Sequence, residues 1–139
     1  MSISVGDALP PFVIERVRPE MMRDWSVFLA DPNPIHLDVA AVQAKGLGDK
    51  RINQGPINVA FMMNMLLAAF PGAQIVAMDS RFLDNVYEGD RVTASGSITA
   101  VEDNRVSCEF SLDVDGRGMV NNGTATLILS ITDLPIQGD

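Results

Sequence analysis

The fold is decided by residues 55–70, which read Gly-Pro-Ile-Asn-Val-Ala-Phe-Met-Met-Asn-Met-Leu-Leu-Ala-Ala-Phe. Pro56 suits the first turn of a helix, where its missing N–H is not needed. Asn58 and Asn64 are the only polar residues after it, and the run is shorter than the roughly 20 residues that span a bilayer. The stretch therefore predicts a core helix that must be covered on nearly all sides.

The second half of the chain supplies strands to cover that helix. Apolar and polar residues alternate over residues 92–100 and again over 106–114, as in half-buried strands. Ala125, Leu127, Leu129 and Ile131 share one face of a further strand, and Gln74 to Leu83 forms a less regular one. Turns are expected at 102–104 and 115–118.

The first half reads as helix and loop. Residues from Pro19 to Ala30 have helical spacing, and Asp38 can cap a short helix that runs through Lys45. Helices followed by consecutive strands indicate the α+β class. One buried helix against a long antiparallel sheet is the arrangement of a hot-dog fold, and periodicity alone also allows other α+β sandwiches.

Composition narrows the class of protein. A chain of 139 residues fits a single domain, 1–139, and a net charge of -8 argues against nucleic-acid binding. The first residues lack the pattern of a signal peptide, so a cytoplasmic protein that does not bind membranes is expected. Cys108 is the only cysteine and lies in an alternating strand pattern, which indicates a buried thiol.

Asp31 and His36 are the candidate acid-base pair. They lie on the segment Asp31-Pro32-Asn33-Pro34-Ile35-His36, where two X-Pro pairs favour an ordered loop. A carboxylate and the only imidazole of the chain on such a loop can converge on one water molecule. The alternative is structural: Asp and Asn before proline also form turns, and a histidine can simply bind a backbone carbonyl.

The segment Gln54-Gly55-Pro56 is a candidate oxyanion site. A helix N-terminus offers free N–H groups and partial positive charge, and a glycine permits close approach of a substrate carbonyl. An ordinary junction between a loop and a helix has the same sequence features.

The run Ala30-Asp31-Pro32-Asn33-Pro34-Ile35-His36-Leu37-Asp38 resembles the MaoC-like family of (R)-specific enoyl-CoA hydratases. The glycine-led apolar helix, Ser80-Arg81-Phe82 and Val86-Tyr87-Glu88-Gly89-Asp90 continue the similarity over nearly the whole chain. The resemblance implies a hot-dog fold, a homodimer with a continuous sheet, and hydration of a trans-2-enoyl-CoA or the reverse dehydration.

The resemblance also implies residue roles. Asp31 and His36 hold and activate water, the Gly55 N–H binds the thioester oxygen, and Asn33 orders the loop. No metal and no cofactor are implied, and CoA enters as part of the acyl-thioester substrate. The chain departs from the family where many members read His-Gly-Met: it has Gln54-Gly55-Pro56, and Asn58 follows where many members have a small or hydroxylated residue. These changed residues are expected to line the acyl pocket, so Gln54 and Asn58 join Gly55 and Asn33 as candidate substrate-binding residues.

Other functions remain open at this stage. Hot-dog thioesterases and the fatty-acid-synthase type of dehydratase place a carboxylate on the central helix, and the segment from Pro56 to Phe70 has none. A non-catalytic module that binds a hydrophobic small molecule is a third candidate, because fold does not determine function. Local cations would have to meet a CoA diphosphate on this acidic protein, and the candidates are Lys50, Arg51 and Arg81.

Overall fold

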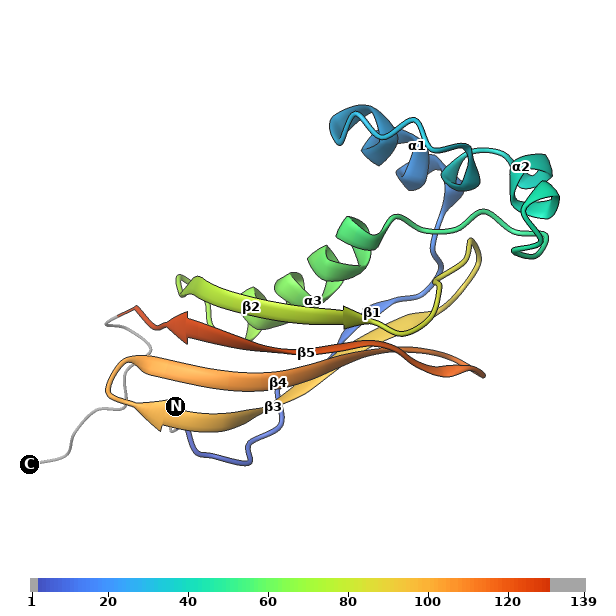
Figure 1. Ribbon diagram of the computed structural model, residues 1–139. Helices are drawn as coiled ribbons and strands as arrows, with labels where there is room; N and C mark the ends of the chain where they lie inside the picture. The colour runs from blue at the N-terminus through green and yellow to red at the C-terminus, as the bar shows by residue number, and fades with distance from the viewer. Residues whose placement is uncertain (1–2, 131–139) are drawn as a thin grey trace, which may run out of the picture.

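The computed structural model describes residues 3–130 and contains one antiparallel sheet of five strands in the order β1-β3-β4-β5-β2. Helix α3 lies against one face of this sheet, and α1 and α2 form a separate lobe at one end (Figure 1). This arrangement confirms the predicted α+β hot-dog class. The elements are β1 (Phe12–Ile14), α1 (Pro19–Phe28), a 3-10 turn (Pro34–His36), α2 (Val39–Ala44), α3 (Gly55–Ala69), β2 (Gln74–Phe82), β3 (Val92–Glu102), β4 (Arg105–Val114) and β5 (Gly118–Ile128).

Within residues 3–130, helix α3 is covered on one side only, which corrects the expectation of nearly complete coverage. Phe61, Met62 and Met65 are buried against the sheet, whereas Leu67 and Ala68 are exposed on the opposite side. A single sheet of five strands reaches only one face of a helix of this length. The described residues therefore leave the other apolar face uncovered.

The boundaries of the elements follow local chemistry. Helix α1 ends at Phe28, two residues before the predicted end, because Ala30 adopts a left-handed conformation with φ of 50°. The Asp38 side chain accepts a hydrogen bond from Ala40 N and caps α2, as predicted. Strand β2 carries the expected irregularity as a register shift between Ile75 and Ala77.

Strand β1 was missed by the sequence analysis because three residues are too few for an alternating pattern. It pairs with the start of β3 and forms one edge of the sheet, with β2 at the other edge. Ile131, the predicted end of the last strand, lies outside the described residues. None of the described helices is long and apolar enough to cross a membrane.

One row of the sheet contains two glycines. Gly96 and Gly123 flank Phe110 in the register of β3, β4 and β5. A Cβ atom on Gly123 would lie 1.9 Å from the Asp79 carbonyl oxygen, so only glycine fits there.

Cys108 is two residues from this row, and burial raises the pKa of its thiol to about 11, which keeps it protonated and unreactive at neutral pH.

Candidate active site

The end of helix α1 fixes the start of the candidate loop. Asp31 N donates to Ser26 O at 2.9 Å and Ala30 N donates to Val27 O at 3.2 Å, the pair of bonds of a Schellman motif. The Ser26 hydroxyl donates to the Asp31 carbonyl oxygen in return. The backbone of Asp31 is therefore held at the point where the helix ends.

Two further bonds order the loop. Asn33 N donates to Asp31 Oδ1 at 3.1 Å, and the Asn33 side-chain oxygen accepts from Ile35 N at 3.3 Å to cap the 3-10 turn. The second carboxylate oxygen, Asp31 Oδ2, lies 3.4 Å from His36 Nε2. The loop thus brings the predicted acid-base pair together, and Asn33 contacts the loop backbone.

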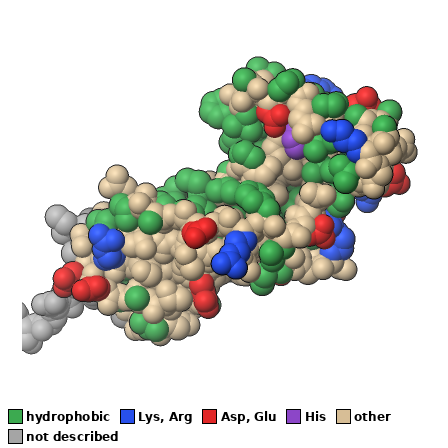
Figure 2. Space-filling view, in the orientation of Figure 1, with side chains coloured by type: hydrophobic (Ala, Val, Ile, Leu, Met, Phe, Trp, Pro, Cys, Tyr) green, Lys and Arg blue, Asp and Glu red, His purple; other side chains and the backbone are tan. Residues whose placement is uncertain are grey.

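His36 is oriented by the opposite side of its ring. Its Nδ1 lies 2.6 Å from the Ile52 carbonyl oxygen, and Ile52 N donates to Ile35 O at 3.0 Å. A carbonyl oxygen can only accept, so Nδ1 carries the hydrogen and Nε2 faces Asp31 with its lone pair in the neutral ring. The side chain of His36 is 9% exposed and that of Asp31 is 34% exposed. Figure 2 shows this histidine at the surface where the helical lobe meets the body.

The start of α3 leaves the Gly55 backbone donor available within residues 3–130. Ile57 N and Asn58 N both donate to the Gln54 carbonyl oxygen, at 3.0 and 3.3 Å, and Pro56 has no N–H. Within residues 3–130, Gly55 N–H forms no hydrogen bond. This N–H lies three residues beyond Ile52, which binds His36, so both halves of the candidate site share one short segment.

Buried amides hold that segment. Gln54 is fully buried, and its Nε2 donates to the Met22 carbonyl oxygen of α1 at 2.7 Å. Asn53 Nδ2 donates to Asn58 Oδ1 at 2.8 Å. Gln54 and Asn58 therefore act as packing residues in this structure, with Gln54 joining α3 to the helical lobe.

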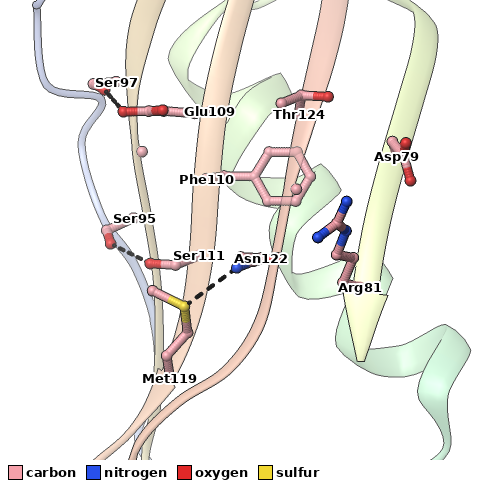
Figure 3. A pocket seen from close by; sticks show the side chains of 12 residues that line it. Asp79, Arg81, Ser95, Ser97, Glu109, Phe110, Ser111, Met119, Asn122 and Thr124 are labelled. Atoms are coloured by element: carbon pink, nitrogen blue, oxygen red, sulfur yellow. Dashed lines mark hydrogen bonds between the residues drawn. The ribbon is translucent and has the colours of Figure 1, made fainter. Parts of the chain in front are cut away.

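The three candidate cations do not converge. Arg51 is bound to Glu88 at 2.9 Å and donates from Nε to the Leu37 carbonyl oxygen. Lys50 is exposed and has no ion pair among residues 3–130. Arg81 lies on the outer face of the sheet, away from α3, in a shallow groove that also contains Asp79 and Glu109 (Figure 3).

Two residues near Gly55 were missed by the sequence analysis. A Cβ atom on Gly55 would lie 3.0 Å from Cε1 of Phe82, so the Phe82 ring covers the glycine. Asn121 pairs with Phe82 across the sheet and is fully buried. The alternation of Ala125, Leu127 and Leu129, extended backwards by two steps, already places position 121 on the inner face.

The comparisons with known proteins agree with this fold. The model of the MaoC-like domain matches residues 10–115. No curated protein matches the sequence.

Several solved structures are similar in fold. An (R)-hydratase from A. caviae involved in PHA biosynthesis has a TM-score of 0.85 and 21% identity over 93% of this chain and 98% of that chain. An R-hydratase from Pseudomonas aeruginosa has a TM-score of 0.82 and 20% identity over 99% of this chain and 93% of that chain. A fluoroacetyl-CoA-specific thioesterase is also similar, with a TM-score of 0.69 and 16% identity over 94% and 90%. At these identities the likeness concerns the fold.

Proposed function

The chain belongs to the family of MaoC-like domains, and we propose that it catalyses the (R)-specific hydration of a trans-2-enoyl thioester or the reverse dehydration. One observation carries this proposal: His36 Nε2 and Asp31 Oδ2 lie 3.4 Å apart, while Nδ1 is held by the Ile52 carbonyl oxygen. Both facing atoms are acceptors, so one water molecule can donate a hydrogen to each.

In the proposed reaction the pair takes a proton from that water as its oxygen bonds to C3 of the substrate. The same proton, or one exchanged with it, is returned to C2, so that the elements of water are added across the double bond. Fixing Nδ1 as the protonated nitrogen leaves Nε2 free for this transfer. General acid-base catalysis of this kind contributes typically about 10²–10⁴-fold.

The Gly55 N–H, which has no hydrogen-bond partner within residues 3–130, is proposed as the oxyanion donor. Negative charge develops on the thioester oxygen when the hydroxyl group adds to C3, and a free N–H at the start of a 15-residue helix stabilises it. One such donor contributes about 10²–10³-fold. The reaction needs no metal or cofactor beyond the carrier of the acyl group.

The carrier is proposed to be CoA. Lys50 is the candidate that can meet a phosphate without losing a partner, whereas Arg51 would have to leave Glu88. Arg81 can take part only if the carrier reaches the outer face of the sheet. Substrate affinity that falls as salt rises supports a phosphate contact, and salt-independent affinity contradicts it.

A homodimer is proposed as the working unit. The uncovered face of α3 exposes Leu67, and the edge strand β2 exposes Val76, which is 45% accessible, beside a backbone edge that is unpaired within residues 3–130. Exposed apolar surface next to a free sheet edge favours pairing with a second copy. Measurement of the molar mass in solution tests this, and a monomer contradicts it.

Two other functions, a thioesterase and a non-catalytic binding module, make different predictions from a hydratase. A thioesterase that uses a carboxylate on the central helix is not supported here, because α3 contains no Asp or Glu. A binding module without catalysis predicts affinity without turnover.

The decisive experiment follows crotonyl-CoA hydration through the absorbance of the enoyl thioester. Activity of the wild type, with chiral analysis giving the (R)-3-hydroxyacyl product, supports the proposal. Release of free CoA without hydration supports a thioesterase, and binding without either reaction supports a binding module.

A further inference from the structure

The inner face of the sheet carries polar side chains without partners beside the candidate site. Asn121 is fully buried, and neither its amide nitrogen nor its amide oxygen forms a hydrogen bond within the described chain. The Ser80 hydroxyl oxygen is buried and also has no partner. Buried polar groups are almost always hydrogen-bonded in native proteins, so three such atoms together require an explanation.

These groups lie next to the residue that covers Gly55. Asn121 pairs with Phe82 and Ser80 pairs with Gly123 in the register of β2 and β5, so Asn121 and Ser80 are diagonal neighbours on the same face. The Phe82 ring covers Gly55, and the Phe82 side chain is 58% exposed. The unpaired amide is thus one side chain beyond the residue that borders the Gly55 N–H.

The outer face of the same strands provides a contrast. Asn122, the next residue along β5, contacts the Met119 sulfur at 3.6 Å, and Ser95 bonds to Ser111 at 3.4 Å (Figure 3). Ser97 likewise donates to Glu109. The side chains of Asn122, Ser95 and Ser97 thus have partners on the outer face, whereas the buried polar atoms of Asn121 and Ser80 on the inner face have none within residues 3–130. Packing of the sheet alone does not account for Asn121.

We propose that Asn121 and Ser80 determine specificity for an acyl chain that carries a neutral oxygen group, such as a hydroxyl or a ketone. The proposal rests on the proposed function, because it assigns the far end of the acyl chain whose thioester oxygen meets Gly55. The acyl chain passes Phe82, and its oxygen group bonds to the Asn121 amide and the Ser80 hydroxyl.

The chemistry of the pair selects a neutral group. An amide and a hydroxyl can both donate and accept, which suits an alcohol or a carbonyl. A carboxylate would need a cation at this buried position, and the nearest arginine along β2, Arg81, lies on the opposite face of the sheet. A plain alkyl chain would leave the polar atoms unpaired, so it is disfavoured.

The test compares matched ligands that do not react. Affinities of hexanoyl-CoA and 6-hydroxyhexanoyl-CoA are measured by calorimetry for the wild type, Asn121→Leu and Asn122→Leu, and the butanoyl and octanoyl pairs are measured in the same way. We expect the wild type to bind one hydroxylated member about tenfold or more tightly than its alkyl counterpart, because an unpaired buried polar group is costly. Asn121→Leu should abolish or invert this ratio, and Asn122→Leu, on the outer face, should keep it.

Folding of the variants is followed by thermal unfolding. Asn121→Leu replaces unpaired polar atoms by an apolar side chain of similar volume, so its Tm should equal or exceed that of the wild type without ligand. Ser80→Ala is the second variant, and it should reduce the ratio with little change in Tm.

The outcomes separate the two proposals. Equal affinities within every ligand pair in the wild type, or a ratio unchanged in Asn121→Leu, overturn the specificity role and indicate that the amide is satisfied by water or by a partner subunit. A hydroxyl preference without hydration of any enoyl-CoA contradicts the proposed function and retains the specificity role. Hydration of crotonyl-CoA together with equal affinity for hydroxylated and alkyl ligands supports the proposed function and contradicts the specificity role.

Discussion

The two halves of the candidate site are built in different ways. The loop from Asp31 to His36 is ordered mainly by bonds between residues two to five positions apart, such as Asn33 N to Asp31 Oδ1. The start of α3 depends on distant partners: Gln54 binds Met22, 32 positions away, and Phe82 covers Gly55. Local bonds therefore order the loop of the proposed acid-base pair, and tertiary packing sets the position of the proposed backbone donor, Gly55 N–H. Substitutions in the two halves should differ in whether they change chemistry or structure.

The largest effect is expected at the loop. Asp31→Asn or His36→Ala should reduce kcat/KM by about 10²–10⁴-fold, because either change removes proton transfer. Asp38→Asn is the matched control: it lies two residues beyond His36 and keeps an N-cap for α2, so activity should be retained. Hydration rates equal to the wild type in Asp31→Asn and His36→Ala would eliminate the acid-base role.

A substitution at the start of α3 should lower the stability of the protein. Gln54→Ala removes the buried bond to the Met22 carbonyl oxygen and leaves a cavity, so the free energy of unfolding should fall by about 2 kcal/mol. Urea unfolding at equilibrium measures this. A stability unchanged within error would mean that the link between α1 and α3 contributes nothing, and the comparison between the two halves would then fail.

A smaller effect is expected at Gly55 itself. In Gly55→Ala the new Cβ lies 3.0 Å from Phe82 Cε1, so the exposed ring must shift. We expect kcat/KM to fall about tenfold, since modest displacement of an oxyanion donor weakens its contact with the substrate. The double variant Gly55→Ala with Phe82→Ala should recover part of this loss. Failure to recover would mean that the methyl group itself obstructs the substrate.

The smallest effect is expected at Ala30, which lies between the end of α1 and the loop that begins at Asp31. Ala30 has φ of 50°, a conformation that suits glycine at the end of a helix. Ala30→Gly should raise the free energy of unfolding by about 0.5–1 kcal/mol and leave kcat/KM unchanged. Loss of activity with a gain in stability would show that the left-handed alanine restrains Asp31 in the reactive position.

Much of the architecture could be predicted because it repeats along the chain. Alternation predicted β3 and β4, and the proline followed by an apolar run predicted α3 within one residue at each end. Strand β1 escaped because its three residues form no repeat. The open side of α3 could not be inferred, since apolar composition does not reveal whether the same chain or another copy covers a face.

The candidate site also has a part that the sequence predicts and a part that it does not. Proline and asparagine between Asp31 and His36 favour an ordered turn, so the sequence alone predicted a loop on which the two side chains can converge. Arg81 was grouped with Lys50 and Arg51 because charge gives no information on the face of a strand. The register shift between Ile75 and Ala77 obscures which residues of β2 share a face. Only the pairing with β5 places Arg81 on the outer face.

The sequence by itself determined the fold class, the central helix and the loop that joins Asp31 to His36, because these depend on periodicity and on bonds between near neighbours. Tertiary structure alone decided that the Ile52 carbonyl oxygen orients His36 and that Phe82 covers Gly55. Each of these contacts joins residues far apart in the chain, and no local pattern encodes the distance between them.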